Sequence, residues 1–282
     1  MAVVSTPAAP GLGRSLAVTP AEGGRDAIRE ALARHGTALV HGCLPDWETA
    51  DQDNPAIRAL RGRDRERYLA LPGAARARFA ASRRLLAHLV AAALDTRPGE
   101  LELGHDPTGR PRVRGLDEIC LSLSHTGRLL LAGLTTRGLL GVDAEAADRA
   151  LRSRSLVRQL CTPWELGELA LLPEAAGDAG LVRLWTLKEA YTKAIGQGMQ
   201  FPFTEFGFGF GDGPLRLLLP DGRPGADTAW SFGSFGLVSG GEAYRVSAAL
   251  LDEGRAPSPG LVLDAEVAGA VTAALYGGGP GP

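Results

Sequence analysis

Leu184 to Gly198 reads LWTLKEAYTKAIGQG and contains the two lysines of the whole 282-residue chain, Lys188 and Lys193. The 30 Lys and Arg residues therefore include 28 arginines. Lysine carries a compact ammonium that can titrate, whereas guanidinium is broad, planar and permanently charged. Lysine at two positions five residues apart indicates a site that places a point charge on a small anion or donates a proton. Two ordinary surface lysines are the alternative.

The same stretch has the spacing of a helix with two different faces, which Gly196 and Gly198 are expected to end. Glu189 and Lys193 lie one turn apart, so an ordinary exposed ion pair is one interpretation of this face. The large indole of Trp185 on the same face argues against a face that is exposed only to solvent. The apolar face consists of Leu184, Leu187, Tyr191, Ala194 and Ile195, and the polar face of Trp185, Lys188, Glu189, Thr192 and Lys193.

Composition restricts the class of protein. An apolar fraction of 45% suffices for a core, and a net charge of −2 gives no indication of nucleic-acid binding or of a basic membrane surface. Three scattered cysteines match neither a metal site nor a disulfide framework, which favours a reducing cytoplasm. We find no signal peptide and no membrane-spanning segment, and expect no membrane partner.

Element order predicts two α+β halves. Residues 1–24 are rich in Pro, Gly and Ala and are expected to be poorly ordered, and the Gly/Pro tail 276–282 is expected to be disordered. The halves are residues 25–138 and 139–275. In the first half we predict a helix over 26–35, a strand over 37–43 and an arginine-rich helical region over 58–94. The second contains strands predicted over 201–210, 215–219, 230–237 and 244–251, and a weak closing segment over 261–275.

Two acids lie at the boundary of the halves. Strands are predicted over 128–135 and 139–145, joined by a tight turn over 136–138. Asp143 and Glu145 stand at i and i+2 on the second strand, so both carboxylates project from one face. A divalent cation with hard oxygen ligands, such as magnesium, would relieve their repulsion. Two acids at an exposed strand edge are the alternative.

Together these residues suit the transfer of a phosphorylated group. Three acids, Asp143, Glu145 and Glu189, can bind a metal or accept a proton, and a lysine can neutralise charge on a leaving group. His125 follows Ser124, although a single histidine is more often structural than a ligand. The clustered arginines form either a solvated face or a phosphate site. No Walker A loop is present.

Two motifs at the right separation resemble those of the 4′-phosphopantetheinyl transferases. GVDAE at 141–145 is similar to the family pattern G-[IV]-D-x-E, and WTLKEAYTKAIG at 185–196 to W-x-x-K-E-[AS]-x-x-K-x-x-G. Order and length resemble the larger, monomeric class that activates surfactin synthetase and polyketide carriers. The family commonly has Phe-Asn where this chain has Leu121 and Ser122. Shorter matches are GRP at 109–111, SHTG at 124–127, TPWE at 162–165 and FPFTEFGF at 201–208.

The resemblance implies a role for each matching residue. Asp143, Glu145 and Glu189 would bind magnesium (manganese as an alternative) with the coenzyme A pyrophosphate, and Glu189 would also act as the base. Lys193 would stabilise the departing 3′,5′-ADP. Nucleotide and phosphate contacts would come from Arg83 (or Arg84), Arg110, Ser124, His125 and Lys188.

The implied fold is α+β, a pseudodimer of two similar sandwich-like halves with coenzyme A in the cleft between them. The implied reaction transfers 4′-phosphopantetheine from coenzyme A to a serine of an acyl or peptidyl carrier protein, catalysed by a cytoplasmic monomer. A non-catalytic coenzyme A-binding or carrier-docking protein and a magnesium-dependent phosphoesterase are the competing hypotheses. The natural carrier cannot be derived from the sequence.

Overall fold

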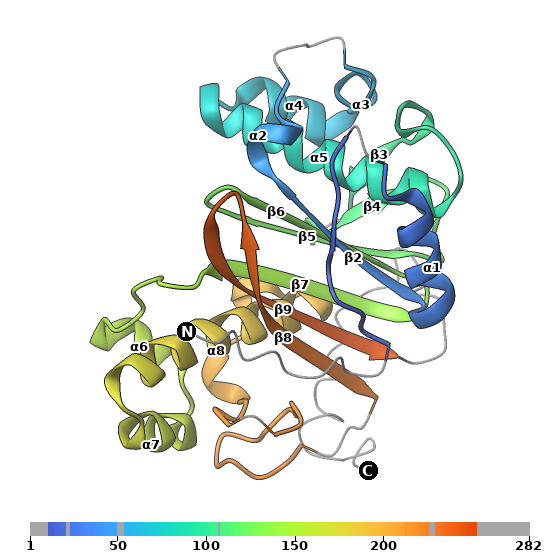
Figure 1. The fold of residues 1–282 in the computed structure, drawn as a ribbon. Coiled ribbons are helices and arrows are strands. Elements are labelled where there is room, and N and C mark those ends of the chain that lie inside the picture. Colours follow the sequence, from blue (N-terminus) through green and yellow to red (C-terminus); the bar gives the residue numbers. More distant parts are fainter. Residues whose placement is uncertain are drawn as a thin grey trace.

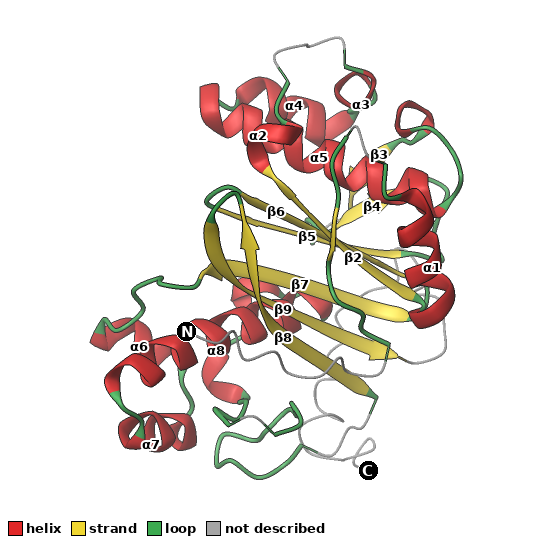
Figure 2. Ribbon diagram, viewed as in Figure 1, coloured by secondary structure: helices red, strands yellow, loops and turns green. Residues whose placement is uncertain are grey.

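The chain folds into four layers, helix, sheet, sheet and helix (Figure 1). The structure is a computed structural model, and it describes residues 11–20, 23–49, 54–106, 108–211, 213–225 and 229–252. Runs of helices and runs of antiparallel strands follow one another along the chain, and Figure 2 shows the two kinds of element by colour, so the α+β class predicted from the sequence is confirmed. Among these residues, no helix has the length and apolar character needed to cross a bilayer.

The first sheet has the strand order β1-β2-β6-β5. Its strands are β1 (Leu16–Ala17), β2 (Thr37–Cys43), β6 (Leu129–Thr135) and β5 (Cys120–Thr126). Only β1 runs parallel to its neighbour among these pairs; β2, β6 and β5 are antiparallel. Helices α1 (Arg25–His35) and α5 (Gly73–Ala93) cover the outer face of this sheet.

The second sheet has the order β7-β9-β8 and is antiparallel throughout. Its strands are β7 (Gly138–Ala146), β9 (Glu242–Asp252) and β8 (Trp230–Ser239). Helix α8 (Glu174–Ala194) packs across β7 and β9 on the outer face. The predicted strands over 128–135 and 139–145 therefore both form, but they belong to different sheets, and residues 136–137 carry the chain from one sheet to the other.

Alternation along the strands produces three apolar layers. On β6, Leu130, Ala132 and Leu134 face α5, whereas Leu129 and Leu131 face the second sheet. This follows from the two-residue period of a strand. Both faces of each sheet are thus buried, which explains the nearly continuous apolar run of β6.

Gly141 lets β7 and α8 approach each other closely. A Cβ at this position would lie 1.8 Å from the carbonyl oxygen of Ala190 and 2.5 Å from the nitrogen of Ala194. No side chain fits there. The glycine of the GVDAE motif is therefore needed for the packing of β7 against α8.

Smaller elements complete the fold. A two-stranded sheet, β3 (Leu103–His105) and β4 (Pro111–Val113), follows the helical region of the first half. The helix α7 (Pro163–Leu171) begins at a capping box in which Thr162 and Glu165 bond reciprocally. The other short helices are α2 (Leu44–Trp47), α3 (Pro55–Arg58), α4 (Gly62–Ala70), α6 (Arg154–Leu160), α7 (Pro163–Leu171), η1 (Pro98–Glu100), η2 (Gly198–Gln200) and η3 (Phe203–Glu205).

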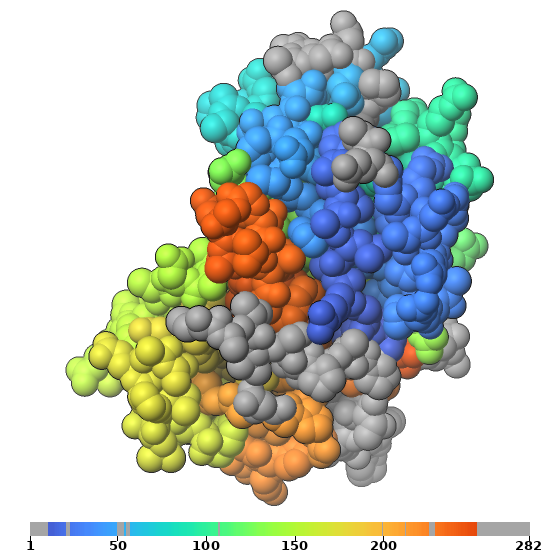
Figure 3. Space-filling model, in the orientation of Figure 1, coloured from blue at the N-terminus to red at the C-terminus, as the bar shows by residue number. Residues whose placement is uncertain are grey.

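The N-terminal expectation was wrong for part of residues 1–24. Leu12 and Val18 are buried, and Leu16–Ala17 pairs with β2. Leu12 enters the apolar layer between the sheets, and the space-filling view shows this early segment lying against the β8–β9 hairpin (Figure 3). An apolar residue every few positions was enough to order a Gly- and Pro-rich segment. The tail 276–282 and the closing segment 261–275 lie outside the described residues.

The expected strands over 201–210 and 215–219 do not form. Instead η3 covers part of the first segment, and a single bridge joins Gly207 to Leu218. The aromatic side chains that suggested strand alternation pack around Tyr191, with Phe206 at a centroid distance of 4.8 Å. Their spacing reflects packing against α8 and not the pleat of a strand.

Candidate functional site

Strand β5 of the first sheet and strand β7 of the second are joined by side chains of β5, which accept hydrogen bonds from backbone N–H groups of β7. The Leu140 N–H donates to Cys120 Sγ (3.3 Å), and the Val142 N–H donates to Ser122 Oγ (2.9 Å). These alternate residues of β5 satisfy β7 groups that would otherwise be buried without partners. Ser122, which departs from the family pattern, thus holds β7 against β5.

The same row of β5 side chains continues to the two acids of β7. Ser124 Oγ donates to Asp143 Oδ1 (2.8 Å), and Thr126 Oγ1 donates to Glu145 Oε2 (3.1 Å). Asp143 is only 5% exposed. The alternative of two exposed acids at a strand edge is therefore wrong. Ser124, which was expected to contact the nucleotide, lines the same pocket as Asp143, and its hydroxyl fixes the orientation of that carboxylate.

One pocket of about 420 Å³ brings the acids of β7 together with the acid of α8. Glu189 is 7% exposed, and its Oε1 has no hydrogen-bond partner among the described residues. Asp143 Oδ2 is likewise buried and without a partner there. The pocket lies between the two halves and is lined from the first half by residues including Arg67, Phe79, Arg83 and His125, and from the second by Asp143, Glu145, Arg149, Trp185, Glu189 and Lys193.

Burial raises the pKa of two of the three carboxyl groups, those of Glu189 and Glu145. Burial is the main cause that raises the pKa of Glu189; Lys193 opposes it, while Asp143 and Glu145 add to it. Burial also raises the pKa of Glu145, against the opposing charge of Arg149. A cation placed among these groups would relieve both effects.

The donor set suits a hard cation in kind, but the described side chains are not arranged around one. Within the described ranges, no group of three or more His, Cys, Asp or Glu residues could hold a metal ion as it stands. Lys193 Nζ lies 2.6 Å from Asp143 Oδ1, and Arg149 is paired with the other acid of β7, Glu145. These two cations occupy carboxylate oxygens that a metal would need. The two unpartnered oxygens, on Asp143 and Glu189, remain the observation in favour of a cation site.

Lys193 belongs to the pocket, as predicted. Its ammonium also lies 3.3 Å from the Val142 carbonyl and 3.4 Å from Ser124 Oγ. Its side chain is 28% exposed, so the charge can reach a ligand in the pocket.

Lys188 does not belong to the pocket, and its expected contact with phosphates was wrong. The side chain is fully buried, and Nζ donates to Glu165 Oε2 at 2.7 Å and to three backbone carbonyls. Glu165 is itself fixed by the N–H groups of Thr162 (2.7 Å) and Phe208 (2.8 Å). Burial lowers the pKa of Lys188, and Glu165 opposes this effect. The three carbonyls are those of Leu160 (2.8 Å), Phe203 (2.6 Å) and Phe206 (2.7 Å).

Arg83, and not Arg84, lines the pocket. Arg83 Nε donates to Asp64 Oδ2 (2.9 Å), and Nη2 contacts His105 Nε2 (2.8 Å). Its guanidinium lies 4.4 Å from the centroid of the Phe79 ring. Arg84 points elsewhere and donates to the Trp47 carbonyl. The structure thus favours Arg83 of the two alternatives left open by the sequence.

His125 also lines the pocket, on the side of the first half. Desolvation lowers the pKa of its imidazole, and the positive charges of Arg78, Lys193 and Arg83 lower it further. We therefore expect a neutral ring at pH 7, which can donate one hydrogen bond to a ligand oxygen.

Arg110 is not among the residues that line this pocket, contrary to the expected phosphate contact. Its Nη2 donates to the backbone carbonyls of Lys193 (2.5 Å) and Ala194 at the end of α8. These hydrogen bonds hold the guanidinium at the C-terminal end of α8.

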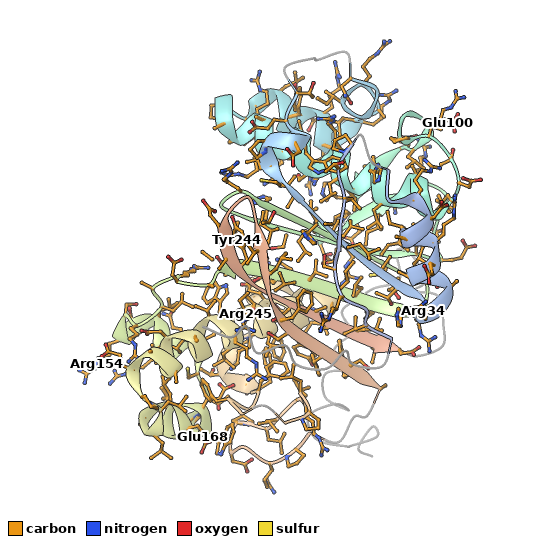
Figure 4. All side chains as sticks on the ribbon, in the orientation of Figure 1. Arg34, Glu100, Arg154, Glu168, Tyr244 and Arg245 are labelled. Atoms are coloured by element: carbon orange, nitrogen blue, oxygen red, sulfur yellow. The ribbon has the colours of Figure 1, made fainter. Side chains whose placement is uncertain are left out.

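Several residues of the pocket region were missed by the sequence analysis. Arg149 pairs with Glu145, and its guanidinium lies 4.6 Å from the Trp185 ring centroid. Its position four residues after Glu145 is a signal that could have been used. Asp64 and His105, which hold Arg83, lie 41 positions apart in sequence and carry no local signal. Charged residues such as Arg34, Glu100 and Arg154 lie at the periphery (Figure 4).

Residues 139–249, which include β7 and α8, match the family model described as the 4′-phosphopantetheinyl transferase superfamily. The match spans both the GVDAE motif at 141–145 and the motif at 185–196. The family resemblance drawn from the two motifs is confirmed.

Relatives of this chain with curated descriptions belong to the same class of enzyme. A phosphopantetheinyl transferase of Thraustochytrium sp. is 34% identical over 172 residues, 56% of this chain and 59% of the relative. The 4′-phosphopantetheinyl transferase HetI of Nostoc sp. is 29% identical over 127 residues (44% and 54%). The 4′-phosphopantetheinyl transferase Sfp of Bacillus subtilis is 24% identical over 114 residues (40% and 50%). The chain spans about half the length of the curated relatives it matches.

Proposed function

We propose that this protein transfers the 4′-phosphopantetheine group of coenzyme A to a serine hydroxyl of an acyl or peptidyl carrier protein. The observation that carries the proposal is the meeting of Asp143, Glu145, Glu189 and Lys193 in one pocket. These are the chemically active residues of the two motifs, and they come from the strand β7 and the helix α8. The match to the superfamily model supports the same reaction class.

The proposed metal is Mg²⁺, with Mn²⁺ as an alternative, held by Asp143, Glu145 and Glu189. When bound, the cation neutralises charge on the pyrophosphate oxygens. Lys193 and Arg149 release the carboxylates of β7 in this proposal, and both become free to contact the anionic ligand. The unpartnered oxygens of Asp143 and Glu189 support the assignment.

Glu189 is the proposed base. Its Oε1 is buried and has no hydrogen-bond partner among the described residues, so it can accept the proton of the carrier serine. The serine oxygen then forms a bond to the phosphorus next to the pantetheine, and the bond from that phosphorus to 3′,5′-ADP breaks. Lys193 stabilises the negative charge that develops on the departing 3′,5′-ADP.

Arg83 and His125 are the proposed contacts for the 3′-phosphate of coenzyme A. Both line the side of the pocket formed by the first half. In this proposal the halves meet at the 138/139 boundary as a pseudodimer, with coenzyme A in the cleft between them. Each half packs a helix of 21 residues on the outer face of its sheet, α5 in the first and α8 in the second, which supports the arrangement. A monomer is sufficient, because both sides of the pocket come from one chain.

Mass spectrometry of an apo carrier protein incubated with this protein, coenzyme A and Mg²⁺ tests the proposal. We expect a gain of one phosphopantetheine group on the carrier. Glu189→Gln and Asp143→Asn should abolish the gain, and Glu168→Gln on α7, outside the pocket, is the matched control. A carrier of unchanged mass with the wild-type protein would leave only a coenzyme A-binding protein or a phosphoesterase. Release of inorganic phosphate would identify the latter.

A further inference from the structure

Arg110 lies on a turn whose geometry is fixed by its own side chains. The Arg110 N–H donates to Asp106 Oδ1 (2.9 Å), and the Arg110 carbonyl accepts from the Asp106 N–H (3.0 Å). Thr108 Oγ1 donates to the same carboxylate (2.6 Å). The turn between β3 and β4 therefore presents Arg110 in a set position, from the first half of the chain.

The guanidinium crosses to the second half and contacts the C-terminal end of α8. Nη2 donates to the carbonyls of Lys193 and Ala194, and Nη1 lies 3.2 Å from Cys120 Sγ. Cys120 Sγ also accepts the Leu140 N–H of β7. One arginine thus connects the β3–β4 turn, β5 and the end of α8.

A positive charge at the C-terminal end of a helix, such as the guanidinium of Arg110 here, stabilises that end. The last carbonyls of a helix lack partners within the helix, and they carry the negative end of its dipole. Here the Gly196 N–H satisfies Lys193 O in part (3.2 Å), with Gly196 in the left-handed region at φ 74°. Arg110 supplies the remaining donors, and it does so to the very residue whose side chain enters the pocket.

We propose that Arg110 is a positioning residue that holds the last turn of α8, and with it Lys193, in the geometry required for transfer. The inference rests on the proposed function for the role of Lys193, but the contact of Arg110 with the helix end can be tested separately. It differs from a phosphate-binding role, because Nη2 of Arg110 donates to the end of α8 and Nη1 donates to Cys120 Sγ.

The experiment compares Arg110→Met, Arg110→Lys and the control Arg114→Met. Arg114 is an exposed arginine just after β4 and pairs only with Glu102 among the described residues. Hydrogen exchange is followed over residues 193–198, binding of 3′,5′-ADP by calorimetry, and carrier modification by kcat and KM for coenzyme A. In Arg110→Met we expect exchange at the end of α8 to be about ten-fold faster.

The kinetic pattern separates positioning from binding. With Arg110→Met, kcat should fall on the order of ten-fold, while KM and the Kd of 3′,5′-ADP stay within about two-fold. Arg110→Lys should recover part of kcat, since an ammonium can still reach one carbonyl, and Arg114→Met should match the wild type. Unchanged exchange, or a large rise in the Kd of 3′,5′-ADP without loss of kcat, would overturn the proposal.

The two proposals can fail separately. If the wild-type protein modifies no carrier, the proposed function fails, while the exchange measurement still decides whether Arg110 holds the helix end. If the wild type is active and the exchange is unchanged in Arg110→Met, only the positioning role fails.

Discussion

Replacing Lys188 by methionine distinguishes a structural lysine from a phosphate-binding one. Four oxygen atoms surround the ammonium at 2.6 to 2.8 Å and share its three N–H donors, in a site with no exposed surface. Methionine is similar in length, so the cavity left behind is small. The change leaves Glu165 and three carbonyls short of a donor, and removal of one member of a buried ion pair costs about 3–5 kcal/mol.

Urea denaturation of Lys188→Met, with Lys193→Met as the comparison, measures this cost. The free energy of unfolding of Lys188→Met should fall by about 3–5 kcal/mol. For Lys193→Met, whose side chain is partly exposed, we expect a change of about 1 kcal/mol or less together with loss of transfer. The reasoning is refuted if Lys188→Met unfolds like the wild type but binds 3′,5′-ADP more weakly, because that pattern belongs to a phosphate ligand.

Three further changes test other parts of the structure. Gly141→Ala places a methyl group against the Ala190 carbonyl and should cost roughly 3 kcal/mol or more in stability, with loss of transfer; a variant as stable as the wild type by thermal unfolding would contradict the packing. Burial holds the pKa of His41 at about 4, so its stabilising contribution is present above pH 6.5 and is lost as the pH falls toward 4. The loss is roughly 3 kcal/mol; His41→Asn should flatten this part of the pH profile in denaturation experiments, and an unchanged slope would count against it. Arg83→Met should weaken 3′,5′-ADP binding about ten-fold or more in calorimetry, and Arg84→Met should not; the reverse result would assign the phosphate to Arg84.

The sequence predicted those features that local periodicity encodes. The strand over 37–43, the helix α1 and the capped start of α7 follow from alternation, helical spacing and a Thr-Pro signal. The acids Asp143 and Glu189 and the ammonium of Lys193 were also placed correctly in one pocket, because a strand and a helix each carry a short motif of fixed geometry.

What the sequence could not predict depends on partners far along the chain. Lys188 and Lys193 lie on one polar helix face, yet one meets Glu165 in the core and the other meets Asp143 in the pocket. Arg110 looked like a phosphate ligand because a motif places a basic residue there, but its partner is a helix end 83 residues away. Aromatic spacing over 201–210 likewise resembled a strand, because it follows the surface of α8.

The burial of Lys188 has a practical consequence for chemical labelling. Because one of the two lysines is buried in the core, amine-directed reagents added to the native protein find a single accessible lysine side chain in this sequence, that of Lys193. A fluorophore or crosslinker of this kind would report directly on pocket occupancy, and protection from labelling would serve as a footprint for any ligand that fills it.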